Sequence, residues 1–242
     1  MPFSPKLPAP SSARPCGLSR TQRIGLGGLE FIPDLSGALY VPDFKALLVA
    51  DLHLEKGSSL ARRGVYLPPY DTRESLSQLR SVIDAVEPAQ VIFLGDSFHD
   101  GEARERFDAS DLTALRAIAA RQQTIWITGN HDPAPPRDIG GAIVDEVALG
   151  PIMLRHQPKS LAYGEMEIAG HLHPAASVAQ RGRRIRCRCF IADRRRIVMP
   201  AFGSYTGAIS VSSEPFDGLF EDYQVWMLGG RAIHRFPAAK VK

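Results

Sequence analysis

The sequence has 242 residues, a hydrophobic fraction of 44% and a formal net charge of +3. This length is enough for one sizeable domain with its own core, and so small a net charge does not by itself identify a nucleic-acid binder. No segment approaches the roughly 18 uncharged apolar residues that a bilayer crossing needs, so we expect no membrane partner.

The N-terminal segment is rich in proline, serine and basic residues and lacks the apolar core of a signal peptide. We expect residues 1–27 to be a disordered leader, unless the true start codon lies further on, and residues 28–242 to form a single domain. Cys16, Cys187 and Cys189 do not make a disulfide framework. Reduced thiols of this kind indicate a cytoplasmic protein.

Strands and helices alternate in the first half of the chain. The expected strands are residues 29–33, 38–41, 45–50, 91–94 and 124–128, and the expected helices are residues 71–86 and 108–121. Asp71 and Asp111 are interpreted as helix caps. This alternation predicts a mainly parallel sheet with right-handed crossovers.

From about residue 141 the pattern changes to short strands and turns with little helical periodicity. The expected strands are residues 143–144, 152–154, 166–169, 185–191, 196–199 and 223–227. They predict a second, largely antiparallel sheet packed on the first. No linker separates the halves, so the fold class is α/β (α+β) in one domain.

Six of the seven histidines fall in five short blocks, and five of these histidines lie close to aspartate, asparagine or glycine. The blocks are Asp51-Leu52-His53, Gly95-Asp96-Ser97-Phe98-His99-Asp100, Gly129-Asn130-His131-Asp132, the single His156, and Gly170-His171-Leu172-His173. Imidazole nitrogens and carboxylate oxygens are ligands for divalent ions. The first three blocks each follow an expected buried strand, where ligand sites form in parallel sheets.

The blocks supply two carboxylates, one amide and four imidazoles as candidate metal ligands: Asp51, His53, Asp96, Asn130, His156, His171 and His173. This set is enough for two ions about 3.5–4 Å apart, with Asp96 able to bridge them. Such a pair suits phosphoester hydrolysis by a metal-bridging hydroxide. An isolated histidine is more often an ordinary polar residue, which is our interpretation of His234. His156 is interpreted as a ligand, because a ligand between Asn130 and His171 is otherwise missing.

Further residues of the blocks are candidates for catalysis. His131 is placed to protonate the leaving oxygen or to stabilise charge there. Asp100 or Asp132 could orient it, and the sequence does not choose between them. His99 is expected at the edge of the substrate site.

An arginine-rich segment, residues 181–196, holds eight arginines and one acidic residue, Asp193. Such a cluster could attract a polyanion, or it could be the solvated rim of a hairpin. Cys187 and Cys189 alternate with arginines, so on a strand the two thiols share one face.

In their order, the histidine blocks resemble the signature of the calcineurin-like metallophosphoesterase superfamily, over roughly residues 45–175. The resemblance implies a four-layer αββα sandwich of two packed mixed β-sheets flanked by helices. It implies that Asp51, His53, Asp96 and His173 bind one ion, that Asp96, Asn130, His156 and His171 bind the other, and that His131 is catalytic.

Three strings, residues 48–56, 169–174 and 199–207, are similar to the bacterial ligase-associated DNA damage response endonuclease (PdeM) family. That family implies a manganese-dependent DNA endonuclease and phosphodiesterase in DNA repair. It also implies a functional association with a DNA ligase, a helicase and an exonuclease. The long N-terminal leader departs from the family pattern.

Three functions are compatible with these observations. The first is a dinuclear metal-dependent DNA nuclease with residues 181–196 as a phosphate track beside the metal cleft. The second is a small-molecule phosphodiesterase or phosphatase with the same site, and the third is a non-catalytic binding module, which the complete ligand set disfavours. Manganese is the expected metal, although iron and zinc suit the same donors. The oligomeric state is not readable.

Overall fold

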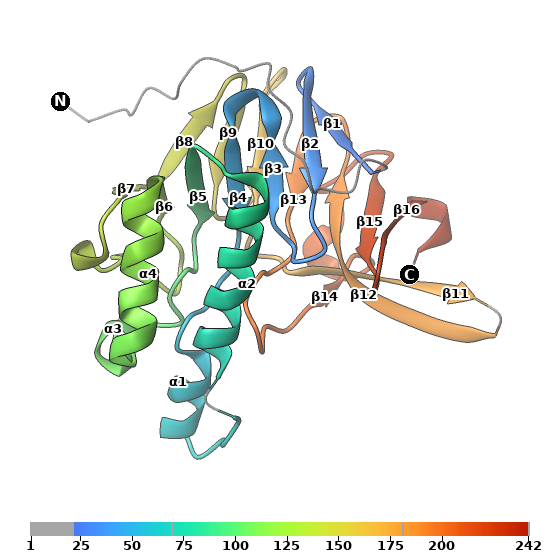
Figure 1. The fold of residues 1–242 in the computed structure, drawn as a ribbon. Coiled ribbons are helices and arrows are strands. Elements are labelled where there is room, and N and C mark those ends of the chain that lie inside the picture. The colour runs from blue at the N-terminus through green and yellow to red at the C-terminus, as the bar shows by residue number, and fades with distance from the viewer. Residues whose placement is uncertain (1–21, 69, 181, 242) are drawn as a thin grey trace.

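The computed structural model describes residues 22–68, 70–180 and 182–241. Two β-sheets pack face to face, and helices cover the outer face of the first sheet (Figure 1). Most of the expected leader, residues 1–21, lies outside the described residues. Ordered structure begins earlier than the expected Gly28, because Ile24–Leu26 already forms a strand.

The first sheet has seven strands in sequence order: β1 (Ile24–Leu26), β2 (Leu29–Pro33), β3 (Leu39–Val41), β4 (Ala46–Val49), β5 (Gln90–Leu94), β6 (Gln123–Ile127) and β7 (Ala142–Val144). Strands β4 to β7 are parallel, as predicted, and β1 to β4 are antiparallel. The strand expected at residues 143–144 was assigned to the wrong sheet, because β7 pairs with β6.

The described helices are α1 (Lys56–Arg62), α2 (Asp71–Val86), α3 (Ala103–Arg106) and α4 (Ala109–Arg121), with four 3₁₀ turns at Pro42–Phe44, Arg137–Ile139, Glu214–Phe216 and Ala238–Lys240. Apolar residues of α2 and α4, such as Leu79 and Leu115, pack on Phe93 and Trp126 of the first sheet. Among the described residues, no helix has the length and apolar character that crossing a membrane requires.

Both predicted helix caps are wrong. The carboxylate that caps α4 belongs to Asp108, which accepts a hydrogen bond from the Ser110 backbone N–H, whereas Asp111 forms an ion pair with Arg73. Asp71 lies inside the first turn of α2 and accepts the backbone N–H of Gly57, which joins α2 to α1. Tertiary contacts therefore use both carboxylates.

The second sheet is mixed. Its strands are β8 (Glu146–Leu149), β9 (Ile152–Arg155), β10 (Met166–Ala169), β11 (Pro174–Gln180), β12 (Arg183–Ala192), β13 (Arg196–Val198), β14 (Ile209–Ser210), β15 (Gln224–Leu228) and β16 (Ile233–Pro237). The order is β14-β11-β12-β13-β10-β9-β8, with β15 and β16 added beside β12. At its centre, β9, β10 and β13 run parallel, which the short strands did not predict.

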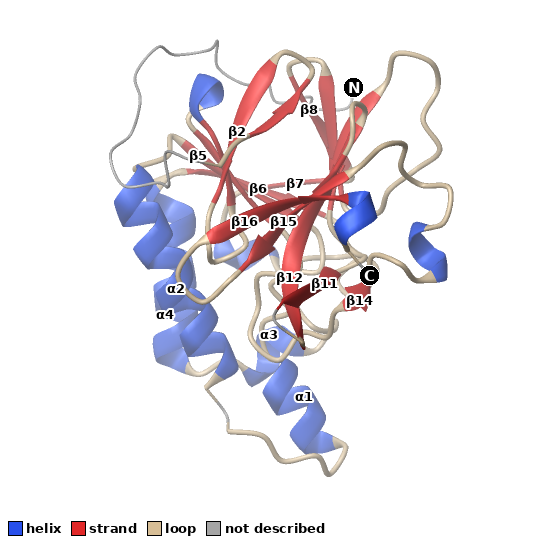
Figure 2. Cartoon of the chain, turned by 90° about the vertical axis from the view of Figure 1, so that its right-hand side faces the viewer, coloured by secondary structure: helices blue, strands red, loops and turns tan. Residues whose placement is uncertain are grey.

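The core between the sheets is mainly apolar. Leu48, Ile92 and Ile125 of the first sheet share it with Ile168 and Phe190 of the second, all with no exposed surface. Each such side chain contributes about 1.5–3 kcal/mol of transfer free energy. A smaller cluster that includes Phe216 of a 3₁₀ turn packs on Ile191 and Val225 of the second sheet. Figure 2 shows short helical turns on the side of the molecule away from α2 and α4. These layers confirm the predicted fold class.

Replacing Ile168 by alanine should lower the free energy of unfolding by about 2–5 kcal/mol, because a cavity opens between the two sheets. Urea denaturation measures this change. Leu35→Ala, at a turn residue that is 38% exposed, is the control and should cost less than about 1 kcal/mol. Equal losses for both variants would contradict a core centred between the sheets.

Candidate metal centre

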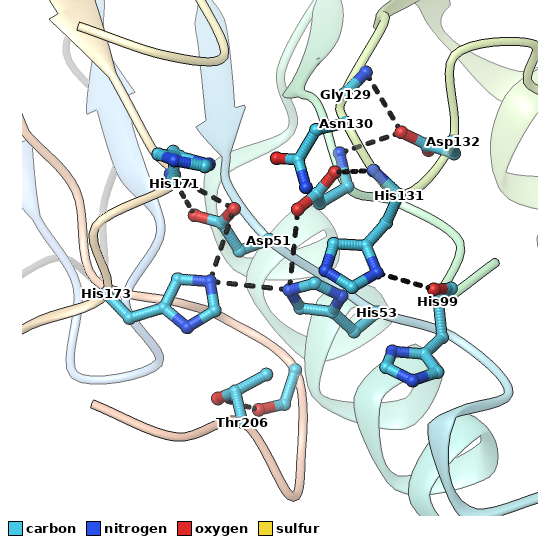
Figure 3. Close-up of polar contacts among 12 residues, drawn as sticks. Asp51, His53, His99, Gly129, Asn130, His131, Asp132, His171, His173 and Thr206 are labelled. Carbon is cyan, nitrogen blue, oxygen red and sulfur yellow. Dashed lines mark hydrogen bonds and ion pairs between the residues drawn. The ribbon is translucent and has the colours of Figure 1, made fainter. Parts of the chain in front are cut away.

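Seven side chains converge at the carboxyl ends of five strands. Figure 3 shows five of them, Asp51, His53, Asn130, His171 and His173. The first sheet contributes Asp51 and His53 after β4, Asp96 after β5 and Asn130 after β6, and the second sheet contributes His156 after β9 and His171 and His173 after β10. The structure thus brings together every residue that was predicted as a metal ligand.

The ligand atoms form two clusters. Asp51, His53 and His173 make one, and Asp96, His156 and His171 make the other, with the ligand atoms of each cluster all within 4.8 Å of one another. They correspond to the two ligand sets that the resemblance implied, except that Asp96 is absent from the first cluster and Asn130 from the second.

Asp96 lies between the clusters. Its Oδ2 atom is 3.4 Å from His156 Nε2 and 3.8 Å from His53 Nε2. Asn130 joins the second cluster, since its Oδ1 atom is 2.9 Å from His156 Nε2. A carboxylate in this position can serve two cations at once.

The donor set fits divalent cations. Nitrogen atoms of neighbouring rings face each other at 3.3 Å between His53 Nε2 and His173 Nε2, and at 3.1 Å between His171 Nδ1 and His156 Nε2. Only one nitrogen of each pair can donate a proton to the other, whereas a cation would accept lone pairs from both. The set mixes nitrogen and oxygen without thiolate, a combination that suits manganese, iron and zinc.

Backbone hydrogen bonds orient two of the imidazoles. The Nδ1–H of His156 donates to the Leu94 carbonyl oxygen at 3.0 Å, and the Nδ1–H of His173 donates to Gly207 at 3.2 Å. Because Nδ1 carries the proton in each ring, Nε2 is the atom directed at the clusters.

The backbone at five of the seven residues is left-handed. The φ angles are 54° at Asp51, 45° at His53, 47° at Asp96, 68° at His171 and 44° at His173. Each costs on the order of 1–3 kcal/mol and persists only where the surroundings enforce it. The concentration of this strain in predicted ligands marks the strand ends as a functional site.

Gly95 permits the close approach of the two sheets. Its φ is +76°, and a Cβ atom there would lie 2.5 Å from the ring of His156. Any larger residue would therefore push the second-sheet imidazole away from Asp96.

Two carboxylates hold the strained turns through backbone N–H groups. Both oxygens of Asp51 accept the N–H of His171, at 3.1 and 2.9 Å, which ties the first sheet to the second. Asp132 is buried and accepts four backbone N–H bonds at 2.8–3.1 Å, from Asp96, Ser97, Phe98 and Gly129. Asp132 is thus a brace for the turn that carries Asp96.

His131 is oriented by a backbone carbonyl. Its Nδ1–H donates to the carbonyl oxygen of His99 at 2.8 Å, and its backbone N–H donates to Asp96 Oδ1 at 2.8 Å. Neither candidate carboxylate has the orienting role that the sequence suggested, because Asp132 braces the turn and Asp100 forms an ion pair with Arg106. The Nε2 atom of His131 remains available for proton transfer.

His99 lies beside His131, as the sequence suggested. The two rings stack with their centroids 5.2 Å apart, and the His99 ring is 5.6 Å from that of His53. Burial and the nearby charges of Lys56 and His131 lower the pKa of His99 to about 4, so this ring is neutral near pH 7.

The charges of the second cluster are set by one pair. Burial opposes the charged form of both His156 and Asp96. The hydrogen bond between them nevertheless lowers the pKa of Asp96 to about 2. The same bond, together with the charges of Asp51 and Asp96, raises the pKa of His156 to about 9. In the first cluster, burial lowers the pKa of His53 to about 2, against the charge of Asp96. Without a cation, the proton therefore resides on His156.

Sequence reasoning missed the loop at residues 203–207 as part of the site. Gly207 contacts His173, and Thr206 lies next to His53 and His173 in Figure 3. The sequence did indicate this loop, because residues 199–207 resemble the corresponding string of the family. The string contains no histidine or carboxylate, so it was not considered as part of a metal site.

Two clusters of carboxylate and imidazole groups at the strand ends of a two-sheet sandwich define a metal-dependent phosphoester hydrolase. The model of the calcineurin-like phosphoesterase family matches residues 44–175. The chain therefore belongs to the calcineurin-like phosphoesterase family, whose members use divalent metals, and the resemblance seen in the sequence is confirmed.

Among solved structures, the chain is similar to the nuclease MPE of Pseudomonas putida, with 27% identity, a TM-score of 0.71, and coverage of 89% of this chain and 99% of that chain. It also matches YfcE, a phosphoesterase from E. coli, with 13% identity, a TM-score of 0.41, and coverage of 79% and 97%. The search of curated proteins gave no match.

Replacing Asp132 by asparagine should reduce both stability and metal content. An amide presents an NH₂ group to two of the four backbone donors, and an unsatisfied buried donor costs about 1–3 kcal/mol. Thermal denaturation and elemental analysis measure the two effects. Asp84→Asn, at an exposed carboxylate, is the control, and an unchanged metal content in Asp132→Asn would contradict the bracing role.

Metal uptake near neutral pH should release about one proton, because His156 must lose its Nε2 proton before it can bind a cation. Calorimetry in two buffers of different ionisation enthalpy measures the number released. The release should fall away as the pH rises past about 9. Binding without proton release near neutral pH would show that His156 is already neutral.

Proposed function

We propose that this protein is a nuclease that cleaves DNA phosphodiester bonds with two divalent ions, manganese being the expected metal. The single observation that carries this proposal is the position of Asp96 between the two clusters of candidate ligands. Similarity to a nuclease over nearly the whole of both chains supports the choice of a nucleic-acid substrate.

Divalent ions held by these residues would activate water and neutralise phosphate oxygens. Asp51, His53 and His173 would hold one ion, Asn130, His156 and His171 the other, and Asp96 both. The chain itself supplies the proton chemistry. His131, fixed through Nδ1 by the His99 carbonyl, presents Nε2 to the leaving oxygen and can donate a proton there.

The arginines of β12 support a polymeric substrate. Arg184, Arg186 and Arg188 alternate along the strand, so they share one face at intervals of about 7 Å. Figure 1 shows the β11–β12 hairpin projecting beyond the rest of the second sheet. A row of cations of this kind can follow a nucleic-acid backbone.

The phosphate track is shorter than the predicted segment 181–196. Arg196 is the first residue of β13, and Arg195 precedes it. Because β13 runs parallel to β10, these two arginines lie at the opposite end of the strands from the metal ligands that follow β10. Arg195 donates to the Leu161 carbonyl oxygen, and Arg196 forms a buried ion pair with Glu167. Arg181 lies outside the described residues. The part of the segment that supports substrate binding is therefore β12.

The narrower resemblance extends this proposal to DNA repair, with a functional association with a DNA ligase, a helicase and an exonuclease. The nuclease neighbour agrees with that resemblance. A small-molecule phosphodiesterase or phosphatase remains the outcome to be distinguished by experiment.

The manganese-loaded protein should cleave a defined DNA oligonucleotide, and His131→Ala should lower the rate by about 10²–10⁴-fold while metal content is retained, because only the proton donor is lost. His234→Ala is the matched control, since His234 is exposed on β16 and should leave the rate unchanged. Hydrolysis of a small phosphodiester without cleavage of DNA would favour the alternative function.

A further inference from the structure

A cavity of about 320 Å³ lies beside the metal centre. It is lined by Arg188 of β12, by Glu74 and Gln78 of α2, and by residues 202–206. Of these residues, only Arg188 was expected to take part, as one of the arginines of residues 181–196. The cavity is open to solvent and mostly polar.

The cavity and the metal centre share a wall. Residues 202–207 form this wall, which is fastened to the ligand loop because the Gly203 N–H donates to the Asp51 carbonyl oxygen at 3.2 Å. A Cβ atom on Gly203 would lie 1.9 Å from the Leu52 carbonyl oxygen, so only glycine fits there. Gly207, at the end of the wall, accepts the hydrogen bond from His173.

Sheet register places Arg188 next to the ligands. Arg188 pairs with Ala175, which is only two residues beyond His173. Of the three arginines on this face of β12, Arg188 is the one at the metal-centre end of the row, and it is half-buried, whereas Arg184 and Arg186 are exposed.

Arg188 is a half-buried cation that forms no ion pair among the described residues. Its guanidinium donates to the Ala201 carbonyl oxygen and makes no ion pair within the described chain. Burial lowers the pKa of Arg188, and no carboxylate offsets that effect. A guanidinium nevertheless stays protonated in proteins, so its remaining N–H donors favour an anionic ligand.

Three hydroxyl groups of the wall are already engaged in hydrogen bonds. The Ser204 hydroxyl donates to Glu74 at 3.0 Å, the Thr206 hydroxyl to the Gly203 carbonyl oxygen at 2.8 Å, and the Tyr205 hydroxyl to the Pro68 carbonyl oxygen at 3.0 Å. These bonds fix the wall, and they leave Arg188 as the only cationic group lining the cavity. Glu74 accepts the Ser204 hydroxyl and is the one carboxylate that lines the cavity.

We propose that Arg188 binds a non-scissile phosphate of the substrate strand, one that neighbours the phosphodiester at the metal centre. Arg188 is then a positioning residue, and the row formed with Arg186 and Arg184 extends the strand's path outward. This inference rests on the proposed nuclease function, because a substrate with a single phosphate has nothing to place there.

The test compares a DNA oligonucleotide with bis(p-nitrophenyl) phosphate, which carries one phosphate. Arg188→Ala should lower kcat/KM for the oligonucleotide about tenfold to a hundredfold, mainly through KM, because a charge-assisted hydrogen bond to phosphate is lost. The loss for the small diester should be at least tenfold less. The slope of log(1/KM) against log[salt] should fall in magnitude by about 0.7–0.9, the contribution of one phosphate contact.

Two further variants make the result specific. Arg188→Lys should recover part of the loss, because it restores the charge but not the paired donors. Arg235→Ala, at an exposed arginine of β16 that stacks over Trp226, should behave as the wild type. Melting temperature and metal content of each variant show whether the fold and the centre are intact.

Equal losses of Arg188→Ala on both substrates, or an unchanged salt slope, would overturn the phosphate subsite while leaving the nuclease function intact. A wild-type protein that hydrolyses the small diester but not the oligonucleotide would overturn the nuclease function, and the subsite with it.

Discussion

The metal centre depends on strand ends held in a backbone conformation that their side chains disfavour. Asp51, His53 and Asp96 of the first sheet, and His171 and His173 of the second, all have positive φ angles. The turns persist because Asp51 and Asp132 accept backbone N–H groups from neighbouring turns. These two carboxylates therefore hold the turns of the site in place without a cation. Because Asp51 of the first sheet binds a turn of the second, the site depends on the packing of both sheets.

Much of this centre could be predicted from the sequence because its residues obey a general rule. In parallel sheets the carboxyl ends of neighbouring strands meet at one edge, so polar blocks after 45–50, 91–94 and 124–128 had to converge. The same rule did not apply to His156, since the parallel pairing of β9 with β10 was not visible in strands of four residues. His156 was instead assigned as a ligand because the set of candidate ligands lacked one between Asn130 and His171.

The remaining features depend on partners that a local pattern cannot reveal. A backbone carbonyl, that of His99, orients His131, and every residue carries such a group. Asp71 and Asp111 were read as caps from their position, yet each is used by a contact from another helix. Arg188 was one of eight similar arginines, and only the register with Ala175 distinguishes it. Sequence spacing thus identified which residues belong to the site, whereas the role of each residue depends on its contacts in the folded protein.

The two-sided character of β12 constrains how this protein can vary. Arg184, Arg186 and Arg188 occupy one face, and Cys187 and Cys189 point into an apolar cluster on the other. A single-residue insertion in the strand would exchange the faces, burying charge and exposing thiols. Insertion of two residues in each strand of the hairpin would add one more cation to the row and leave the packing unchanged. The reach of the hairpin can therefore lengthen in steps of one rung during evolution, independently of the catalytic chemistry.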